Sequence, residues 1–178
     1  MKGNSDMSLS IHDALVPVLA RALTNLGGVL EKGRLHAESE KVDPAILLGM
    51  RLYPSMFALT RQAQVVSDGA KGCMARLAAV EAPKFEDTES SFEELKQRID
   101  KTLVFVKGFD ARQLEGADSR PVVVKFPNGA LNFKNGWDYL QTFVLPNIYF
   151  HSSMAYGILR HAGVKLAKSD FLGSIGSG

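Results

Sequence analysis

The side chains best suited to chemistry lie late in the chain, in the segment Leu145-Pro-Asn-Ile-Tyr-Phe-His151. Asn147 and His151 are four residues apart, so in a helix they point to the same side. Pro146 breaks the helix there and leaves a backbone carbonyl one turn earlier without its donor. A polar pair beside such a break is where helical proteins build sites. We therefore predict a ligand-binding site at His151; the alternative is a core histidine bonded to a backbone carbonyl.

Metal and nucleophile chemistry have little support in the residue pattern. A zinc site needs about three side-chain ligands, and the four histidines form no HxxxH, HExxH or ExxH motif. We expect His12 near the start of the first helix, His36 in a loop and His161 in the last helical turn. Cys73 is the single cysteine and is expected to be a buried apolar residue. No metal is therefore expected, with a bound divalent metal as the alternative.

Gln64, Asp68 and Lys71 follow one another at helical spacing in the second quarter of the chain. One interpretation is a solvated helix face with an Asp–Lys pair. The other is that this helix is covered on both sides, so that Gln64 and Asp68 meet the region of His151 and contact a ligand.

Three large residues, Tyr53, Met56 and Phe57, flank Pro54. They either pack in the core or form the wall of a pocket near His151. We include them among the candidate ligand-binding residues.

These side chains must be positioned by helices, because apolar residues recur at helical spacing through most of the chain. We expect helices over residues 10–31 (kinked at Pro17), 43–80 (interrupted at Tyr53-Pro54), 91–108 and 136–162. Residues 32–41 are polar and read as a loop. The β-branched run after Pro121 and the turn at Pro127-Asn-Gly129 predict a small β-hairpin. The fold class is therefore all-α, a four-helix bundle with a hairpin between the third and fourth helices.

Composition limits the classes of function. The chain has 178 residues, a net charge of +2 and no basic run, so no nucleic-acid partner is expected. No stretch of about 18 apolar residues predicts a membrane span, and we expect a cytoplasmic protein. Residues 10–173 are expected to form one domain, between a disordered N-terminus (1–9) and a flexible tail (174–178).

Several motifs in combination resemble an uncharacterised bacterial and fungal domain-of-unknown-function family of the DinB/YfiT-like superfamily. The resemblance runs from about Leu9 to Gly173. It implies a bundle with a long crossover that forms homodimers. The motifs are Arg51-Leu-Tyr-Pro-Ser-Met-Phe57, Gln62-Ala-Gln64 with Asp68-Gly-Ala-Lys71, the segment ending at His151, Ala155-Tyr-Gly-Ile-Leu-Arg-His-Ala-Gly163 and Lys168-Ser-Asp-Phe-Leu-Gly173.

Many members of that superfamily hold a divalent metal with three histidines, one on the second helix and an HxxxH pair on the last, and some use it for thiol-dependent transfer or isomerisation. In that superfamily the HxxxH pair is followed by a Leu-Arg pair and a glycine, which correspond here to Leu159-Arg160 and Gly163. In this alignment the second histidine of the pair falls on His151 and the first on Asn147. The second helix has no histidine, and Ser55 replaces an expected acidic residue. His151 is thus the only retained ligand position.

Three functions remain open. The first is a small-molecule-binding protein or metal-independent enzyme with a pocket near His151. The second is a non-catalytic dimeric structural or stress-related protein. The third is a degenerate metal-dependent transferase. The expected partners are a second copy of the chain and a small-molecule ligand, without nucleic acid or membrane.

Overall fold

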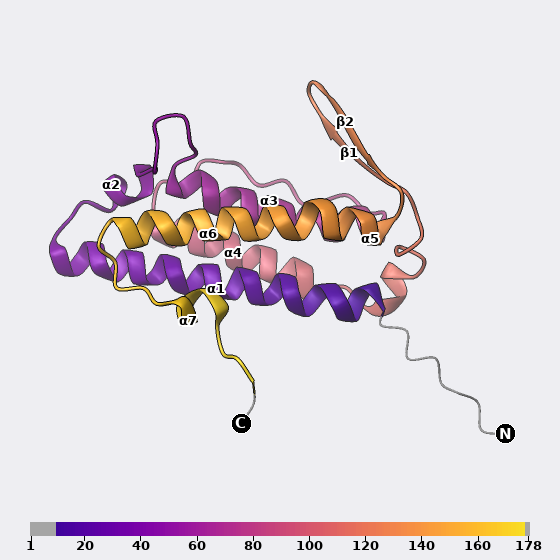
Figure 1. Ribbon diagram of the computed structural model, residues 1–178, viewed down its shortest axis with the longest axis horizontal. Coiled ribbons are helices and arrows are strands. Elements are labelled where there is room, and N and C mark those ends of the chain that lie inside the picture. The colour runs from indigo at the N-terminus through magenta and orange to yellow at the C-terminus, as the bar shows by residue number, and fades with distance from the viewer. Residues whose placement is uncertain (1–9, 177–178) are drawn as a thin grey trace.

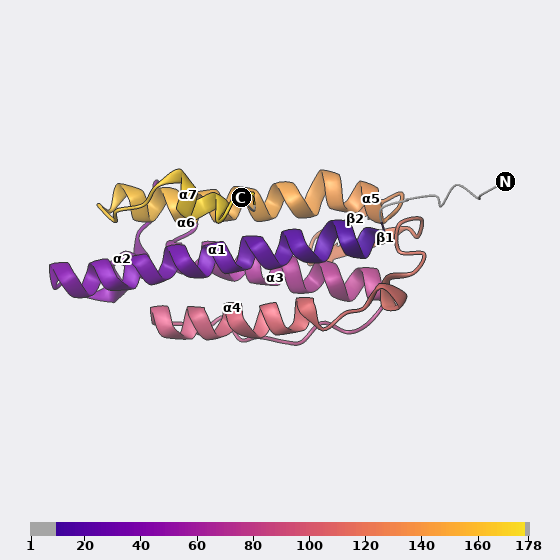
Figure 2. The ribbon, with the colours of Figure 1, turned by 90° about the horizontal axis from the view of Figure 1, so that it is seen from below.

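The computed structural model describes residues 10–176, which are mostly helical with one antiparallel two-stranded hairpin (Figure 1). Four long helices, α1 (Ile11–Glu40), α3 (Leu59–Ala78), α4 (Phe92–Lys107) and α6 (Leu145–His161), lie along the long axis (Figures 1 and 2). The predicted N-terminal tail at 1–9, and residues 177–178 of the tail predicted at 174–178, fall outside the described residues. The simple count of four helices is not confirmed, because shorter elements join or cover the long ones: α2 (Pro44–Gly49), η1 (Ala111–Leu114), β1 (Val122–Phe126), β2 (Gly129–Phe133), α5 (Gly136–Tyr139), η2 (Leu140–Val144) and α7 (Lys168–Leu172).

The long helices form a closed ring of neighbours, in which α1 and α3 each pack on both α4 and α6. Residues 79–91 run back along the length of the molecule from the end of α3 to the start of α4 (Figure 2). We call this extended segment the strap. Because the strap returns the chain to its starting end, α3 and α4 point the same way, and α6 runs against α3.

Helix α1 is longer than the sequence predicted. It continues through residues 32–40, which were expected to be a loop, and therefore includes His36. Gly33 and Ala37 extend the buried face, and Leu159 of α6 approaches Gly33 so closely that a Cβ there would lie 2.9 Å from it. Pro17 does not end the helix. The polar residues of this segment are the outward face of a packed helix.

The second predicted helix is divided more deeply than expected. Asp43 caps α2 by accepting a hydrogen bond from the amide of Ala45, with Pro44 in the first turn, as the sequence indicated. Residues 50–58 are then irregular, and α3 begins only at Leu59. The motif around Pro54 is therefore an exposed loop at one end of α3.

The sequence predicted that Pro146 would break the last helix, but the structure has a π-helical turn before Pro146 instead. One turn of π-helix, η2, precedes α6, and the amide of Leu145 donates to the carbonyl of Leu140. Pro146 lies in the first turn of α6, where a missing N–H disturbs least. The π turn absorbs one extra residue, so α5, η2 and α6 form one rod (Figure 1).

The cap of α4 and the hairpin are confirmed. Ser91 and Glu94 form a reciprocal capping box, and Val124 pairs with Leu131 across the hairpin. Val122 and Val124 join the core from one face of β1. The hairpin projects from the end of the molecule where α5 begins (Figure 1).

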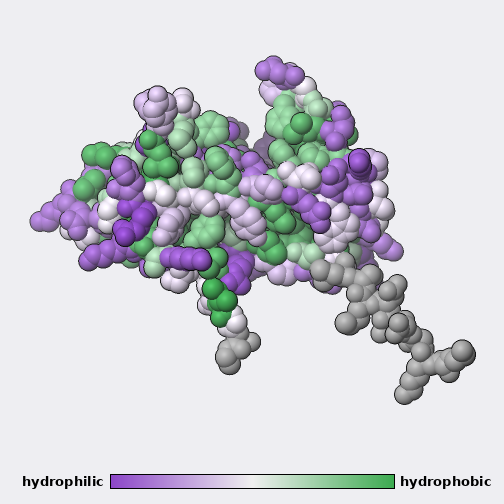
Figure 3. Space-filling model, viewed as in Figure 1, coloured by the Kyte–Doolittle hydropathy of each residue, from purple (hydrophilic) through white to green (hydrophobic). Residues whose placement is uncertain are grey.

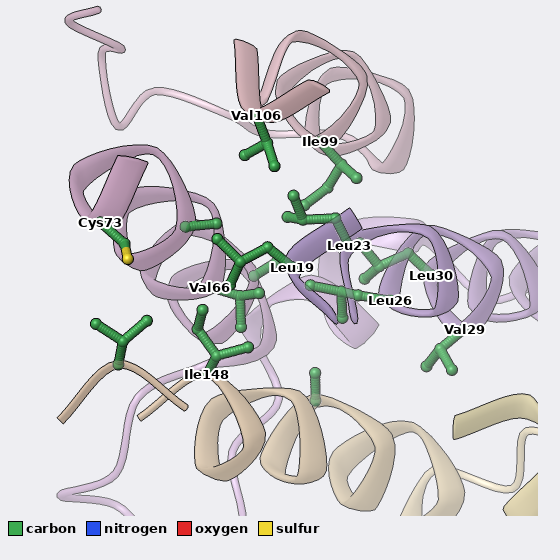
Figure 4. Packing of buried hydrophobic residues seen from close by; sticks show 14 of the residues in the cluster. Leu19, Leu23, Leu26, Val29, Leu30, Val66, Cys73, Ile99, Val106 and Ile148 are labelled. Atoms are coloured by element: carbon green, nitrogen blue, oxygen red, sulfur yellow. The ribbon is translucent and has the colours of Figure 1, made fainter. Parts of the chain in front are cut away.

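Apolar side chains from all the long helices meet between them (Figure 4). Cys73 is buried there, as predicted, and burial raises the pKa of its thiol far above the ordinary value. Within residues 10–176, α1 alone is long and apolar enough to cross a membrane. That signal is weak, because the apolar stripe of α1 faces the other helices. Labelled core residues in Figure 4 are Leu19, Leu23, Leu26, Val29, Leu30, Val66, Cys73, Ile99, Val106 and Ile148.

Candidate functional site

His151 lies on α6 with its ring directed toward α3, and 9% of the residue is exposed. Its Nδ1 is 2.6 Å from the side-chain oxygen of Gln62 on α3. The amide nitrogen of Gln62 donates to the carbonyl of Phe57 at 3.0 Å, which orients the amide oxygen toward His151. An amide oxygen can only accept a hydrogen bond, so Nδ1 carries the proton.

This tautomer leaves a lone pair on Nε2. No hydrogen-bond partner of Nε2 occurs within residues 10–176. Burial, followed by the positive charge of Arg61, lowers the pKa of His151 below its ordinary value, so the ring is neutral near pH 7. The site thus presents a neutral imidazole with a fixed tautomer and one free accepting atom.

Aromatic rings surround His151. Phe57 stacks with it at 6.1 Å between ring centroids and 22° between planes, and Phe150 meets it edge-on at 5.1 Å. The guanidinium of Arg61 lies over the ring of Phe57, with its central carbon 5.8 Å from the ring centroid. This aromatic wall is open to solvent, since Phe57 is 50% exposed and Phe150 is 54% exposed.

Of the three large residues near Pro54, the structure brings Phe57 against His151. Tyr53 is exposed and Met56 is half-buried in the same loop. Tyr53 and Phe57 are therefore not packed in the core, which was one of the two interpretations of this motif.

Asn147 lies one turn before His151 and is half-buried against α3. Its amide nitrogen is 3.8 Å from the point that a Cβ on Gly69 would occupy. Gly69 therefore lies opposite Asn147 where α3 and α6 pack together. Asn147 and His151 thus share the α3 side of α6, as their spacing predicted.

Gln64 and Asp68 face the strap, away from the ring of His151. Gln64 donates to Glu89 of the strap at 2.8 Å and accepts from Arg61 at 3.2 Å. Asp68 pairs with Lys71 at 2.9 Å. Because Gln64 and Lys71 are buried, the interpretation of this line as a solvated face is wrong. Arg61 links Gln64 to the aromatic wall.

Arg98 of α4 holds the strap. Its side chain is 2% exposed and pairs with Asp68 at 2.8 Å, Glu89 at 2.8 Å and Asp87 at 3.0 Å. Burial acts to lower the pKa of Arg98, but the three carboxylates outweigh it and raise the pKa. The ring of Phe85, in the strap, also lies against this guanidinium, and its centroid is 5.5 Å from the central carbon of the guanidinium. Asp68 therefore contributes to a structural ionic network.

The donor set at His151 does not fit a three-histidine metal site. His12 instead contacts Asp13 and the carbonyl of Phe109, and no group of three His, Cys, Asp or Glu residues close enough for one metal occurs within residues 10–176. His151 would offer one nitrogen, with amides of Gln62 and Asn147 nearby, and amide oxygens are poor replacements for imidazole on zinc or nickel.

Two features of the site were not foreseen. The three principal cavities among residues 10–176 are lined by residues other than His151 and Asn147, so the pocket predicted at His151 is not one of them. Gln62, which sets the tautomer, was not singled out. Its signal was a polar side chain beside the apolar stripe of Leu59, Ala63 and Val66.

The comparisons with known proteins agree with this architecture. Residues 11–172 match the family described as "Domain of unknown function (DUF1993)". The chain is similar to the crystal structure of a DinB family member protein from Shewanella denitrificans, with 35% identity, a TM-score of 0.85 and coverage of 94% of each chain. No curated protein matches the chain. The chain therefore belongs to the DUF1993 domain family and has a DinB-like fold.

Proposed function

We propose that the protein binds a small molecule at His151 without a metal. The observation that carries this proposal is the bond from His151 Nδ1 to Gln62, which leaves Nε2 free to accept. Buried polar side-chain atoms are usually hydrogen-bonded, so an imidazole that served packing alone would be expected to pair both nitrogens within the fold. Here one nitrogen is satisfied and the other has no partner among residues 10–176.

The surroundings favour an aromatic ligand that carries a hydrogen-bond donor. Phe57 offers an exposed ring beside His151, and aromatic pairs favour offset-stacked or edge-on contacts. Tyr53 and Met56 belong to the same loop and can close over a ligand. Asn147 adds an amide one turn away on the same side of α6. In an enzyme, the Nε2 lone pair would accept a proton as general base.

The proposal can be tested with phenol, which donates a hydrogen bond, and anisole, which has a ring of similar shape but no donor. In two-dimensional NMR titrations, phenol is expected to shift amides around residues 57, 62 and 151, and anisole to bind several-fold more weakly. His151→Gln should abolish the difference, whereas His161→Gln should preserve it. Equal binding of phenol and anisole would remove the proposal.

We also propose that this site holds no divalent metal, against the alternative of a degenerate metal-dependent transferase. The single imidazole supports this proposal. Titration with zinc and nickel, followed by calorimetry, is expected to give the same weak affinity for the parent chain and His151→Gln. A tight, stoichiometric site that His151→Gln removes would establish the alternative.

The second candidate function, a dimeric structural protein, is supported by apolar side chains on the projecting hairpin. Val123, Phe126 and Leu131 are each more than two-fifths exposed, and the hairpin carries visible apolar surface (Figure 3). Exposed apolar patches often mark interfaces. Light scattering after size exclusion should give a dimer that Phe126→Ser dissociates, with Val104→Ser on α4 as control. A monomeric parent chain would rule out this candidate.

A further inference from the structure

A cavity of about 330 Å³ lies on the opposite side of α6 from His151, between α1, α6 and α7. Its volume is at the lower end of the range typical of small-molecule sites, roughly 300–1,000 Å³. Two of its wall residues, Ala22 and Ser152, are small, and α1 packs less extensively on α6 than on α4. The lining residues are Val18, Arg21, Ala22, Asn25, Leu26, Val29, Tyr149, Ser152, Phe171 and Leu172.

The first observation that favours a ligand site over a simple packing defect is the hydroxyl of Ser152. Its hydroxyl is buried and has no hydrogen-bond partner in the part of the chain that the structure describes. Nearly all buried polar side-chain atoms are paired. An unpaired hydroxyl on a residue of the cavity wall therefore points to a partner that is not part of residues 10–176.

Arg21 is the second sign, as the one residue with a permanent charge among the lining residues. Its guanidinium donates to the carbonyls of Leu172, at 2.6 and 2.9 Å, and Ser174. It takes part in no ion pair within residues 10–176. The cavity thus combines an apolar wall with a cation whose charge is not neutralised by a carboxylate.

Helix α7 covers this cavity and is held by polar links. Asn25 donates to the carbonyl of Phe171 at 2.9 Å, and Lys32 pairs with Asp170 at 2.7 Å. No residue of α7 is buried. The cover can therefore lift and return without opening the core, which gives a ligand a path into the cavity.

We propose that this cavity binds a small anionic amphiphile, with its apolar body between α1 and α6 and its carboxylate at Arg21. The ligand carboxylate would replace the backbone carbonyls that Arg21 now contacts, and Ser152 would pair with a polar atom of the ligand. This site is separate from His151, and its ligand class follows from the isolated charge of Arg21 and the apolar wall.

The test uses three probes with ten-carbon chains: decanoate and decyltrimethylammonium below their micelle-forming concentrations, and decan-1-ol below its solubility limit. Calorimetry and NMR on the full chain are expected to show that decanoate binds at least 10-fold more tightly than the other two, with shifted amides in α1, α6 and α7. Ala22→Phe should weaken decanoate binding at least 10-fold by filling the cavity. Ala22→Leu, a smaller filling change, should weaken it less.

Charge variants separate a specific site from general attraction. Arg21→Gln should reduce decanoate affinity to that of decan-1-ol, while Arg112→Gln, at an exposed arginine of η1, should leave it unchanged. Equal affinity for all three probes would overturn the proposal. A decanoate affinity that is unchanged in both folded Ala22 variants would overturn it as well.

Discussion

The two sides of α6 satisfy their polar groups in different ways, although His151 and Ser152 are adjacent in the chain. On the α3 side, His151 finds the oxygen of Gln62 at 2.6 Å and keeps one nitrogen free beside an open aromatic wall. On the α1 side, the hydroxyl of Ser152 is buried without a partner, next to a cavity. One helix therefore has two different environments on its two sides, a hydrogen-bonded imidazole beside exposed aromatic rings and an unpaired hydroxyl beside a covered, mostly apolar space.

The segments that cover these sides differ in the same way. The strap is fastened to α3 and α4 by the buried guanidinium of Arg98 and three carboxylates. Helix α7 is fastened by exposed or half-buried polar groups such as Arg21 and Lys32. Buried ion pairs are costly to break, whereas exposed ones contribute little. We therefore expect the strap to be a permanent part of the fold and α7 to be a movable cover.

The largest effect should come from breaking the strap's anchor. Arg98→Leu removes the cation that Asp68, Asp87 and Glu89 share, and is expected to lower the free energy of unfolding by about 3 kcal/mol. Asp68 keeps Lys71 and Asp87 keeps Arg61, so Glu89 is the carboxylate that loses its ion pair within residues 10–176. Urea denaturation measures this loss. Arg21→Gln, which touches only the cover, is expected to cost less than about 1 kcal/mol. Similar losses in the two variants would show that α7 is anchored as firmly as the strap.

A smaller effect is expected from Gln62→Leu. This change leaves Nδ1 of His151 without its acceptor in a mostly buried position, so the free energy of unfolding should fall by about 1–3 kcal/mol. Gln97→Leu, on the exposed face of α4, serves as the matched control and should change little. If Gln62→Leu were as mild as the control, the hydrogen bond would not be holding His151.

The two histidines with shifted pKa values should give opposite pH dependences. The pKa of His151 is lowered from about 6.5 by burial and Arg61, so its contribution to stability is complete above about pH 6.5 and falls as pH decreases through the lowered pKa. The pKa of His12 is raised, chiefly by its bond to Asp13. Its contribution is complete below about pH 6.5 and falls as pH rises through the raised pKa.

Urea denaturation from pH 5 to 8 can separate these contributions when each parent curve is compared with that of the corresponding Gln variant. The difference for His151→Gln should grow with pH, and the difference for His12→Gln should shrink. Slopes of the same sign for both variants would contradict the environments described for the two rings.

The smallest effect should come from Ser152→Ala. Removing a buried hydroxyl that has no partner is expected to change the free energy of unfolding by less than about 1 kcal/mol, in the stabilising direction. Ser67→Ala is the matched comparison, because Ser67 is also buried but is bonded to Thr102 at 2.7 Å. It should be destabilising. A loss of stability in both variants would mean that Ser152 is paired.

Local patterns in the sequence predicted the elements whose cause is local. The Asp43-Pro44 start, the Ser91 capping box and the hairpin turn each depend on neighbouring residues, and each is confirmed. The placement of Asn147 and His151 on one side of α6 follows from helical spacing alone.

Features that depend on distant residues were missed. Residues 32–40 are helical because Gly33 and Ala37 pack on other elements, which a polar composition conceals. Gln62 and His151 are 89 positions apart in the sequence, so their hydrogen bond was not readable from spacing. The cavity beside Ser152 arises where side chains fail to fill space between helices.

The most direct test of the account is a long-range ¹H–¹⁵N NMR spectrum of the His151 ring near pH 7.5, assigned with His151→Gln. The structure predicts a protonated Nδ1 and an unprotonated Nε2 in a neutral ring, with Nε2 shifting when phenol is added and both nitrogens averaging in Gln62→Leu. A neutral ring protonated at Nε2, or a doubly protonated ring at this pH, would contradict the account.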